Sequence, residues 1–173
     1  SKTTTRIDDL LRNNTNSIQT VSYTIVPAST TTPFCKGNSH TIQVNVYPST
    51  QILNLDSYSI CSGVQQNISL ASNVPATFSW SAADNPSTTG ENSITKNSNY
   101  LDDRIINNTN ITQIVQYSVK AISSSGNCNS ITKLITLNVN PLPIASLTAS
   151  SSAVICNGSF VQLNGNTGSG FSY

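Results

Sequence analysis

A fixed period of domain size constrains the fold of this chain more than any other feature of its sequence. Residues 11–16 return 94 positions later as residues 105–110, and both segments contain Asn-Asn-Thr-Asn. Residues 21–25 return at the same spacing as residues 115–119. Repetition at a fixed period is typical of proteins built as arrays of like units, in which each unit contacts its neighbours.

A second repeated segment sets the unit boundaries. Residues 60–63 (Ile-Cys-Ser-Gly) return 95 positions later as residues 155–158 (Ile-Cys-Asn-Gly), so the chain passes through parts of three units. We expect the C-terminal part of a first unit over residues 1–48, a complete unit over residues 49–142, and the N-terminal part of a third unit over residues 143–173. The neighbouring units are then the first expected partners of each unit.

The composition excludes several classes of function. Only 9% of the residues are charged and the net charge is +1, whereas about 25% are charged in an average soluble protein. No run of basic residues is present, which argues against nucleic acids and anionic membranes as partners. No apolar run approaches the ~20 residues that a membrane-spanning helix needs, so we expect no membrane insertion.

Apolar and polar residues alternate with the period of a β-strand. Residues 115–121 place four apolar side chains on one face and three polar ones on the other, and residues 135–139 repeat the pattern. A turn rich in Ser, Gly and Asn over residues 123–130 separates them, which indicates an antiparallel hairpin. The expected core consists of Ile68, Leu70, Trp80, Tyr117, Val119, Leu137 and Val139.

The rest of the complete unit also favours short strands, and no segment has the period of a helix. Further strands are expected over residues 52–58, 65–71, 76–81, 93–96 and 101–106. About seven strands with a tryptophan on the third are typical of an immunoglobulin-like sandwich, in which such a tryptophan lies between the sheets. We therefore interpret Trp80 as a core residue rather than as a platform on which a sugar stacks.

The order of these features resembles the PKD-like repeats of very large bacterial surface proteins, over essentially the whole chain. The motifs that carry the resemblance are Ile60-Cys61-Ser62-Gly63, Trp80, Gly90, Asn107–Asn110, Val115–Val119, Cys128 and Leu137–Pro141. The resemblance implies an all-β fold of immunoglobulin-like (PKD-like) antiparallel β-sandwich repeats in tandem. It also implies secretion, often through type IX machinery, with roles in adhesion, in gliding motility or as spacers in secreted enzymes, and it implies no catalytic residues.

The four cysteines occupy two repeating positions. Cys35 and Cys128 lie in the last turn of their units, and Cys61 and Cys156 lie before the second strand. Recurrent cysteines favour disulfides and an oxidising, extracellular setting over a zinc site, and buried free thiols are the alternative. The two turns lie at opposite ends of a sandwich, whereas bonded cysteines need Cα atoms about 4.4–6.8 Å apart. We therefore expect disulfides between neighbouring units rather than within one.

Little in the sequence favours catalysis or a bound cofactor. His40 is the only histidine, and no phosphate-binding loop, nucleophile elbow or zinc-protease motif is present. Asp102 and Asp103 repeat an earlier Asp-Asp pair and are weak candidates for calcium ligands, but a solvated bend between strands is the leading interpretation. We expect no enzyme activity and no cofactor.

Five Asn-x-Ser/Thr triplets begin at Asn13, Asn67, Asn107, Asn110 and Asn157. These asparagines are glycan acceptors only if the source organism has the glycosylation machinery, and many such triplets arise by chance in a chain rich in Asn, Ser and Thr.

These observations predict a structural and adhesive repeat of a long bacterial cell-surface protein, with the sandwich as a rod segment outside the cell. Expected partners beyond the neighbouring units are a surface polysaccharide or another cell-surface protein. The alternative is a polysaccharide-binding or spacer module of a secreted hydrolase, and a row of exposed aromatic side chains would favour it.

Overall fold

The computed structural model describes residues 6–144, 146–149 and 154–165, and this part of the chain forms strands, turns and loops without a helix. It therefore contains no helix that could cross a membrane. The strands are β1 (Gln19–Ile25), β2 (His40–Val46), β3 (Ser57–Cys61), β4 (Ile68–Ser69), β5 (Ala76–Ala82), β6 (Thr88–Thr89), β7 (Lys96–Asn97), β8 (Tyr100–Leu101), β9 (Ile106–Asn107), β10 (Gln113–Ser123), β11 (Lys133–Asn140), β12 (Leu147–Ala149) and β13 (Leu163–Gly165). The fold is all-β and immunoglobulin-like.

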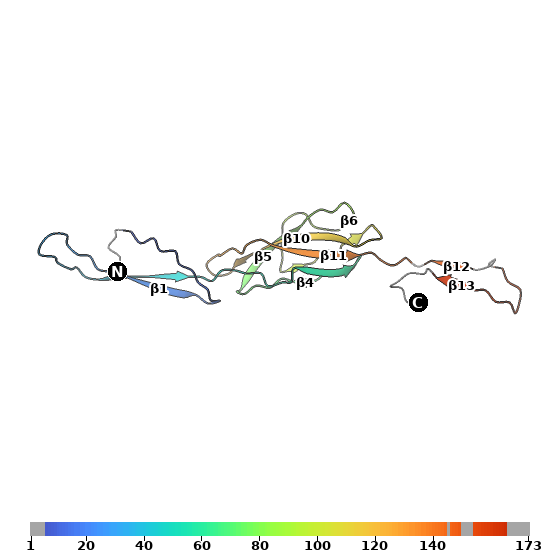
Figure 1. The fold of residues 1–173 in the computed structure, drawn as a ribbon, viewed down its shortest axis with the longest axis horizontal. Helices are drawn as coiled ribbons and strands as arrows, with labels where there is room; N and C mark the ends of the chain where they lie inside the picture. Colours follow the sequence, from blue (N-terminus) through green and yellow to red (C-terminus); the bar gives the residue numbers. More distant parts are fainter. Residues whose placement is uncertain (1–5, 145, 150–153, 166–173) are drawn as a thin grey trace.

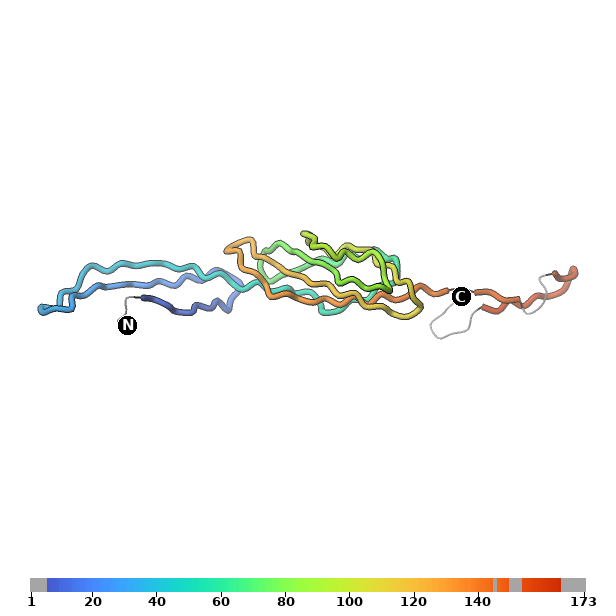
Figure 2. The backbone as a smooth tube through the Cα atoms, turned by 90° about the horizontal axis from the view of Figure 1, so that it is seen from above, coloured from blue at the N-terminus to red at the C-terminus, as the bar shows by residue number. Residues whose placement is uncertain are grey.

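Three bodies follow one another along the long axis of the molecule (Figures 1 and 2). The β1–β2 hairpin comes first, a sandwich built from β3 to β11 occupies the middle, and the β12–β13 pair comes last. We call the end of the sandwich that faces the β1–β2 hairpin its leading end. The end that faces β12 is its trailing end.

The main sheet of the sandwich has five strands in the order β3-β11-β10-β5-β7. Two short pairs, β4 with β8 and β6 with β9, complete the sandwich. Leu101 in β8 and Ile105 just before β9 are fully buried in the same cluster as the inner face of the main sheet. The main sheet thus covers one side of the core, and the two short pairs cover the other side as a discontinuous layer, which we call the broken layer.

The expectation of purely antiparallel strands is wrong at one ladder, since β3 pairs with β11 in parallel. The physical reason is the path of the chain. It comes into the sandwich at the leading end and leaves at the trailing end, so the first and last strands both run from leading to trailing end. The other ladders of the main sheet are antiparallel, as expected.

The core lies between the inner face of the main sheet, which carries Trp80 on β5 and the buried side chains of β10 and β11, and the layer of short strands that packs on it. The rings of Trp80 and Tyr117 meet edge to face, with centroids 5.6 Å apart and an interplanar angle of 67°, an arrangement that aromatic pairs prefer. Of the seven residues expected in the core, six are buried and Ile68 is half-buried against them. The six buried residues are Leu70, Trp80, Tyr117, Val119, Leu137 and Val139.

The early strands of the sandwich differ most from expectation. β3 covers Ser57–Cys61 rather than residues 52–58, and β4 is reduced to Ile68–Ser69 from the expected residues 65–71. The weak strands expected over residues 93–96 and 101–106 become the two-residue strands β7, β8 and β9.

The side chain of Asn54 explains part of this difference. Its Nδ2 donates to the carbonyl oxygen of Ser69 at 2.8 Å, and its Oδ1 accepts from the N–H of Ala71 at 2.8 Å. A buried side-chain amide thus takes the place of a main-chain ladder, which asparagine can do because its amide both donates and accepts like a peptide group.

The β1–β2 hairpin repeats the β10–β11 hairpin without its cover. Both pair a Tyr with an Ile across the ladder. Ile25, Ile42 and Val44 are 42%, 46% and 38% exposed, whereas their counterparts Val119, Ile135 and Leu137 are all 0% exposed. The exposed apolar face of the first hairpin therefore corresponds to the buried inner face of the second.

Hydrogen exchange should distinguish the two hairpins within one molecule. We expect amide hydrogens of β1 to exchange several orders of magnitude faster than those of β10, because opening β1 exposes little new apolar surface whereas opening β10 disrupts the core. Exchange of Tyr23 and Tyr117, measured by NMR, gives a matched pair with the same strand register. Equal protection of the two amides would contradict the incomplete-unit interpretation.

Candidate functional site

The Asn-Asn-Thr-Asn motif forms a side-chain clamp at the trailing end of the sandwich. Asn107 is 8% exposed, and its Nδ2 donates to the carbonyl oxygens of Ile111 at 2.7 Å and Val139 at 2.8 Å. Its Oδ1 accepts from the N–H of Thr109 at 2.8 Å. The clamp joins the turn before β10 to the end of β11.

The same clamp occurs in the first hairpin, with the same atoms. Asn13 Nδ2 donates to the carbonyl oxygens of Ser17 and Val46, both at 2.7 Å, and Asn13 Oδ1 accepts from the N–H of Thr15 at 2.9 Å. The repeated sequence is thus a repeated set of hydrogen bonds. These bonds occupy the amides of Asn13 and Asn107, whereas the glycosylation triplets at Asn67, Asn110 and Asn157 begin with exposed residues.

The opposite end of each hairpin carries a second repeated device, built on serine and cysteine. Ser123 Oγ accepts from the N–H of Cys128 at 3.0 Å, and Ser29 Oγ accepts from the N–H of Cys35 at 2.9 Å. In both turns the serine N–H also donates to the cysteine carbonyl oxygen. Each cysteine therefore lies at a fixed position in a closed turn.

The sandwich keeps its two cysteines far apart. Cys61 ends β3 and pairs with Asn140, the last residue of β11, whereas Cys128 comes before Lys133, the first residue of β11. A strand of 8 residues spans about 26 Å at ~3.3 Å per residue, so this geometry excludes a disulfide between Cys61 and Cys128. All four cysteines are free in the structure. Cys35, Cys61 and Cys156 are exposed, and Cys128 is half-buried.

The calcium candidates are held by other protein groups. Asp103 Oδ2 accepts from the hydroxyl of Tyr117 at 3.0 Å and from the N–H of Asn92 at 2.9 Å. Asp102 forms an ion pair with Lys96. Among the described residues, no group of three or more His, Cys, Asp or Glu side chains could hold a metal ion.

Burial is the main influence on the ionisation of Asp103 and Tyr117. Burial raises the pKa of Asp103 above its ordinary value, although its hydrogen bonds with Asn92 and Tyr117 and the charge of Lys96 oppose the shift. Burial, reinforced by the charge of Asp103, also raises the pKa of Tyr117. The same contact recurs in the first hairpin, where the hydroxyl of Tyr23 donates to Asp9 at 3.3 Å. The repeated Asp-Asp pair thus anchors a repeated tyrosine.

Sequence reasoning missed three buried polar residues that hold the unit together. Gln66 is 2% exposed and donates to the hydroxyl of Tyr117. Thr50 is 3% exposed and its hydroxyl donates to the carbonyl oxygen of Cys128 at 2.7 Å. Asn54 is the third. No spacing or repeat singles out these residues, because Gln, Thr and Asn are common on the surface of such a chain.

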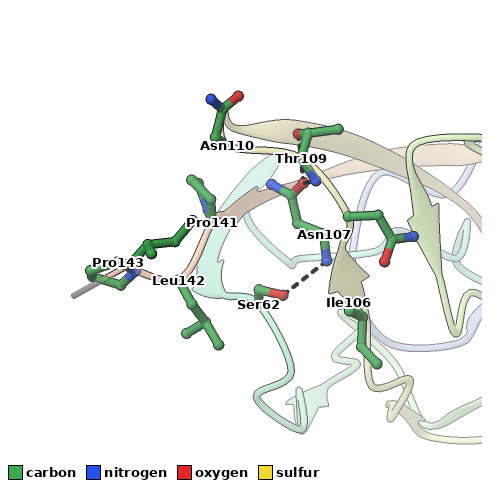
Figure 3. A pocket seen from close by; sticks show the side chains of 10 residues that line it. Ser62, Ile106, Asn107, Thr109, Asn110, Pro141, Leu142 and Pro143 are labelled. Atoms are coloured by element: carbon green, nitrogen blue, oxygen red, sulfur yellow. Dashed lines mark hydrogen bonds between the residues drawn. The ribbon is translucent and has the colours of Figure 1, made fainter. Parts of the chain in front are cut away.

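A pocket of about 860 Å³ opens at the trailing end, beside the Asn107 clamp (Figure 3). Ser62 on its wall accepts a hydrogen bond at its Oγ from the N–H of Asn107 at 2.9 Å. The lining residues are Ser62, Ile106, Asn107, Asn108, Thr109, Asn110, Pro141, Leu142, Pro143 and Ile144. This set offers neutral amides, hydroxyls and apolar surface, with no charged group and no nucleophile paired with a base. Its chemistry suits packing and recognition.

In a comparison with known protein families, the model of a PKD-like domain matches residues 1–50 and 58–143. The matched residues make up well over half of the chain. They include the first hairpin with its Asn13 clamp and most of the sandwich with its Asn107 clamp. A search of curated proteins gives no match.

Replacement of Asn107 by alanine should destabilise the sandwich by about 1–3 kcal/mol, because the carbonyl oxygens of Ile111 and Val139 lose a buried donor. Chemical denaturation monitored by Trp80 fluorescence measures the change. Asn108→Ala is the matched control, since Asn108 is exposed and neighbours the clamp. Equal stability of the two variants would show that the clamp contributes nothing.

Proposed function

Because the chain belongs to the PKD-like domain family, we propose that it is a structural and adhesive rod segment of a long protein on the surface of a bacterium. The observation that carries this proposal is the parallel pairing of β3 with β11. With its first and last strands parallel, a unit takes the chain in at one end and releases it at the other. Such units add their lengths when they follow one another, as Figures 1 and 2 illustrate for the three bodies of this chain.

The surface of the sandwich suits this role. Its trailing-end pocket is neutral, and the whole chain carries only 9% charged residues. Contacts between neutral polar groups depend little on ionic strength, because screening acts on charges. A rod outside the cell would therefore keep its properties across changes in salt.

The observations do not favour the alternative of a polysaccharide-binding module. Trp80 and Tyr117 are 1% and 0% exposed, so neither can stack on a sugar, and Tyr100 is the one exposed aromatic side chain among the described residues of the sandwich, which does not make a row. A spacer in a secreted hydrolase would use the sandwich in the same mechanical way as a surface rod. Gliding motility is a further use of such a rod, and the proposed partners remain a surface polysaccharide or a second surface protein, bound elsewhere in the parent protein.

The rod proposal is tested by exchanging the unit in the source bacterium. Residues 49–142 are replaced by an unrelated β-sandwich whose two ends are equally far apart, and attachment of the cells to their substratum is measured. We expect attachment to be retained, because a rod needs length rather than a particular surface. Deletion of the same residues should reduce attachment.

Digestion of intact cells with an external protease is the accompanying control, since a surface rod must be cleaved without lysis. If the exchange abolishes attachment while the exchanged protein is still displayed, the unit itself recognises a ligand and the rod proposal fails.

The cysteines supply a second test of the proposal that such units follow one another along the parent protein. We propose that Cys61, at the trailing end, and Cys128, at the leading end, form disulfides with neighbouring units, since the sandwich excludes a bond between them. Peptide mapping of the parent protein without reduction should find each of them joined to a cysteine of another unit. A cross-linked peptide containing Cys61 and Cys128 would contradict both the proposal and the strand order.

A further inference from the structure

We infer that successive units bind each other through a specific end-to-end interface, and that the trailing-end pocket is the docking surface for the leading end of a further PKD-like unit. The inference rests on the proposed rod function only for its biological use. It starts from the joint between the first hairpin and the sandwich, where both sides of the interface are described.

Asn73 of the sandwich reaches across this joint. Its Nδ2 donates to Asn16 Oδ1 at 2.9 Å and to the carbonyl oxygen of Ser49 at 3.0 Å. Its Oδ1 accepts from the N–H of Gln51 at 2.7 Å, which fixes the amide within its own unit. Asn16 is the last residue of the Asn-Asn-Thr-Asn motif in the first hairpin, so a repeated motif supplies the acceptor.

Gly126, in the turn between β10 and β11, forms the second contact. It has a φ of +76°, which favours glycine, and a Cβ at this position would lie only 2.4 Å from the ring of Tyr47. The glycine backbone therefore lies directly on the aromatic ring at the end of the first hairpin. Glycine meets two requirements here, a left-handed conformation and close approach to a ring.

The chain between the two units is packed as well. Pro48 is buried, and the buried Thr50 donates to the carbonyl oxygen of Cys128. Proline also fixes its own φ, which limits bending. The joint is thus held by the connecting chain, by Asn73 and by Gly126, and the direction of the first hairpin relative to the sandwich is specified.

Within the part of the chain that the structure describes, the trailing end of the sandwich presents the equivalent surface with no such loops against it. Asn110 corresponds to Asn16 and Pro141 corresponds to Pro48, and both line the pocket in Figure 3. At the first joint this place is taken by loops of the next unit, residues 72–74 and 125–127. The occupant that fits the pocket is therefore the same pair of loops from a further PKD-like unit. Both surfaces are neutral, so the pairing depends on shape and amide hydrogen bonds.

NMR of the 173-residue chain tests the first joint directly. The face of the Tyr47 ring should shift the Hα resonances of Gly126 upfield, and Tyr47→Leu should return them to ordinary values. Asn16→Ala should reduce the upfield shift, because the joint loses an acceptor for Asn73. Asn110→Ala, the same substitution at the other end, should leave the shift unchanged. Ordinary Gly126 shifts in the unaltered chain, or equal responses to the two alanine variants, would overturn the interface.

The docking surface is tested in a chain in which residues 1–141 are followed by a second copy of residues 49–142. NMR relaxation should give both sandwiches one common tumbling time, and Asn110→Ala in the first copy should now separate the two times. Independent tumbling before the substitution would overturn the docking inference. This result does not depend on cell attachment, so a failed interface and a failed rod function are told apart.

Discussion

The hydroxyl of Tyr117 lies where the layers of the sandwich meet. The residue stands in the middle of β10, donates to Asp103 beside the short strands, and accepts from Gln66 in the segment that leads to β4. Its ring contacts Trp80 edge to face, which brings in β5. A buried hydroxyl without partners would cost free energy, so these hydrogen bonds fix the position of the broken layer over the continuous sheet.

Comparison of the two hairpins distinguishes hydrogen bonds that need only nearby residues from burial that needs the whole sandwich. The first hairpin lacks the cover that buries the second, yet it forms the same asparagine clamp, the same serine–cysteine turn and the same tyrosine–aspartate contact. These polar devices depend on a few neighbouring residues and on one hairpin ladder. Burial of Val119, Ile135 and Leu137 depends on strands that are distant in sequence, which the sandwich supplies.

This division explains what the sequence could predict. Strict alternation over residues 115–121 and 135–139 identified the hairpin and its inner face, because β10 and β11 have one buried and one exposed side. The pairing of β3 with β11 could not be predicted from local pattern, since it depends on where the chain comes into the unit and leaves it. The strand expected over residues 65–71 is shorter in the structure, in part because the side chain of Asn54 takes the place of main-chain ladder bonds at Ser69 and Ala71.

The sequence repeat marks the residues of the candidate site, but it does not show which hydrogen bonds they form. The repeat singled out Asn13 and Asn107, but an Asn-x-Thr triplet also suggests a glycan acceptor, and only the geometry shows that both amides are engaged. Asn73 and Gly126 carried no signal, because one lies outside the repeated segments and the other in a turn where glycine is ordinary. Contacts between units leave little trace within one unit's sequence.

The parallel pairing of β3 and β11 has a mechanical consequence. Five residue pairs join these strands, from Ser57 with Thr136 to Cys61 with Asn140. When the two ends of the unit are pulled apart, β3 is drawn towards the leading end and β11 towards the trailing end. The strands must then slide past each other, and their hydrogen bonds are loaded together in shear. An antiparallel pair pulled from one end would instead open one bond at a time, so this topology makes the unit resist extension along its own axis.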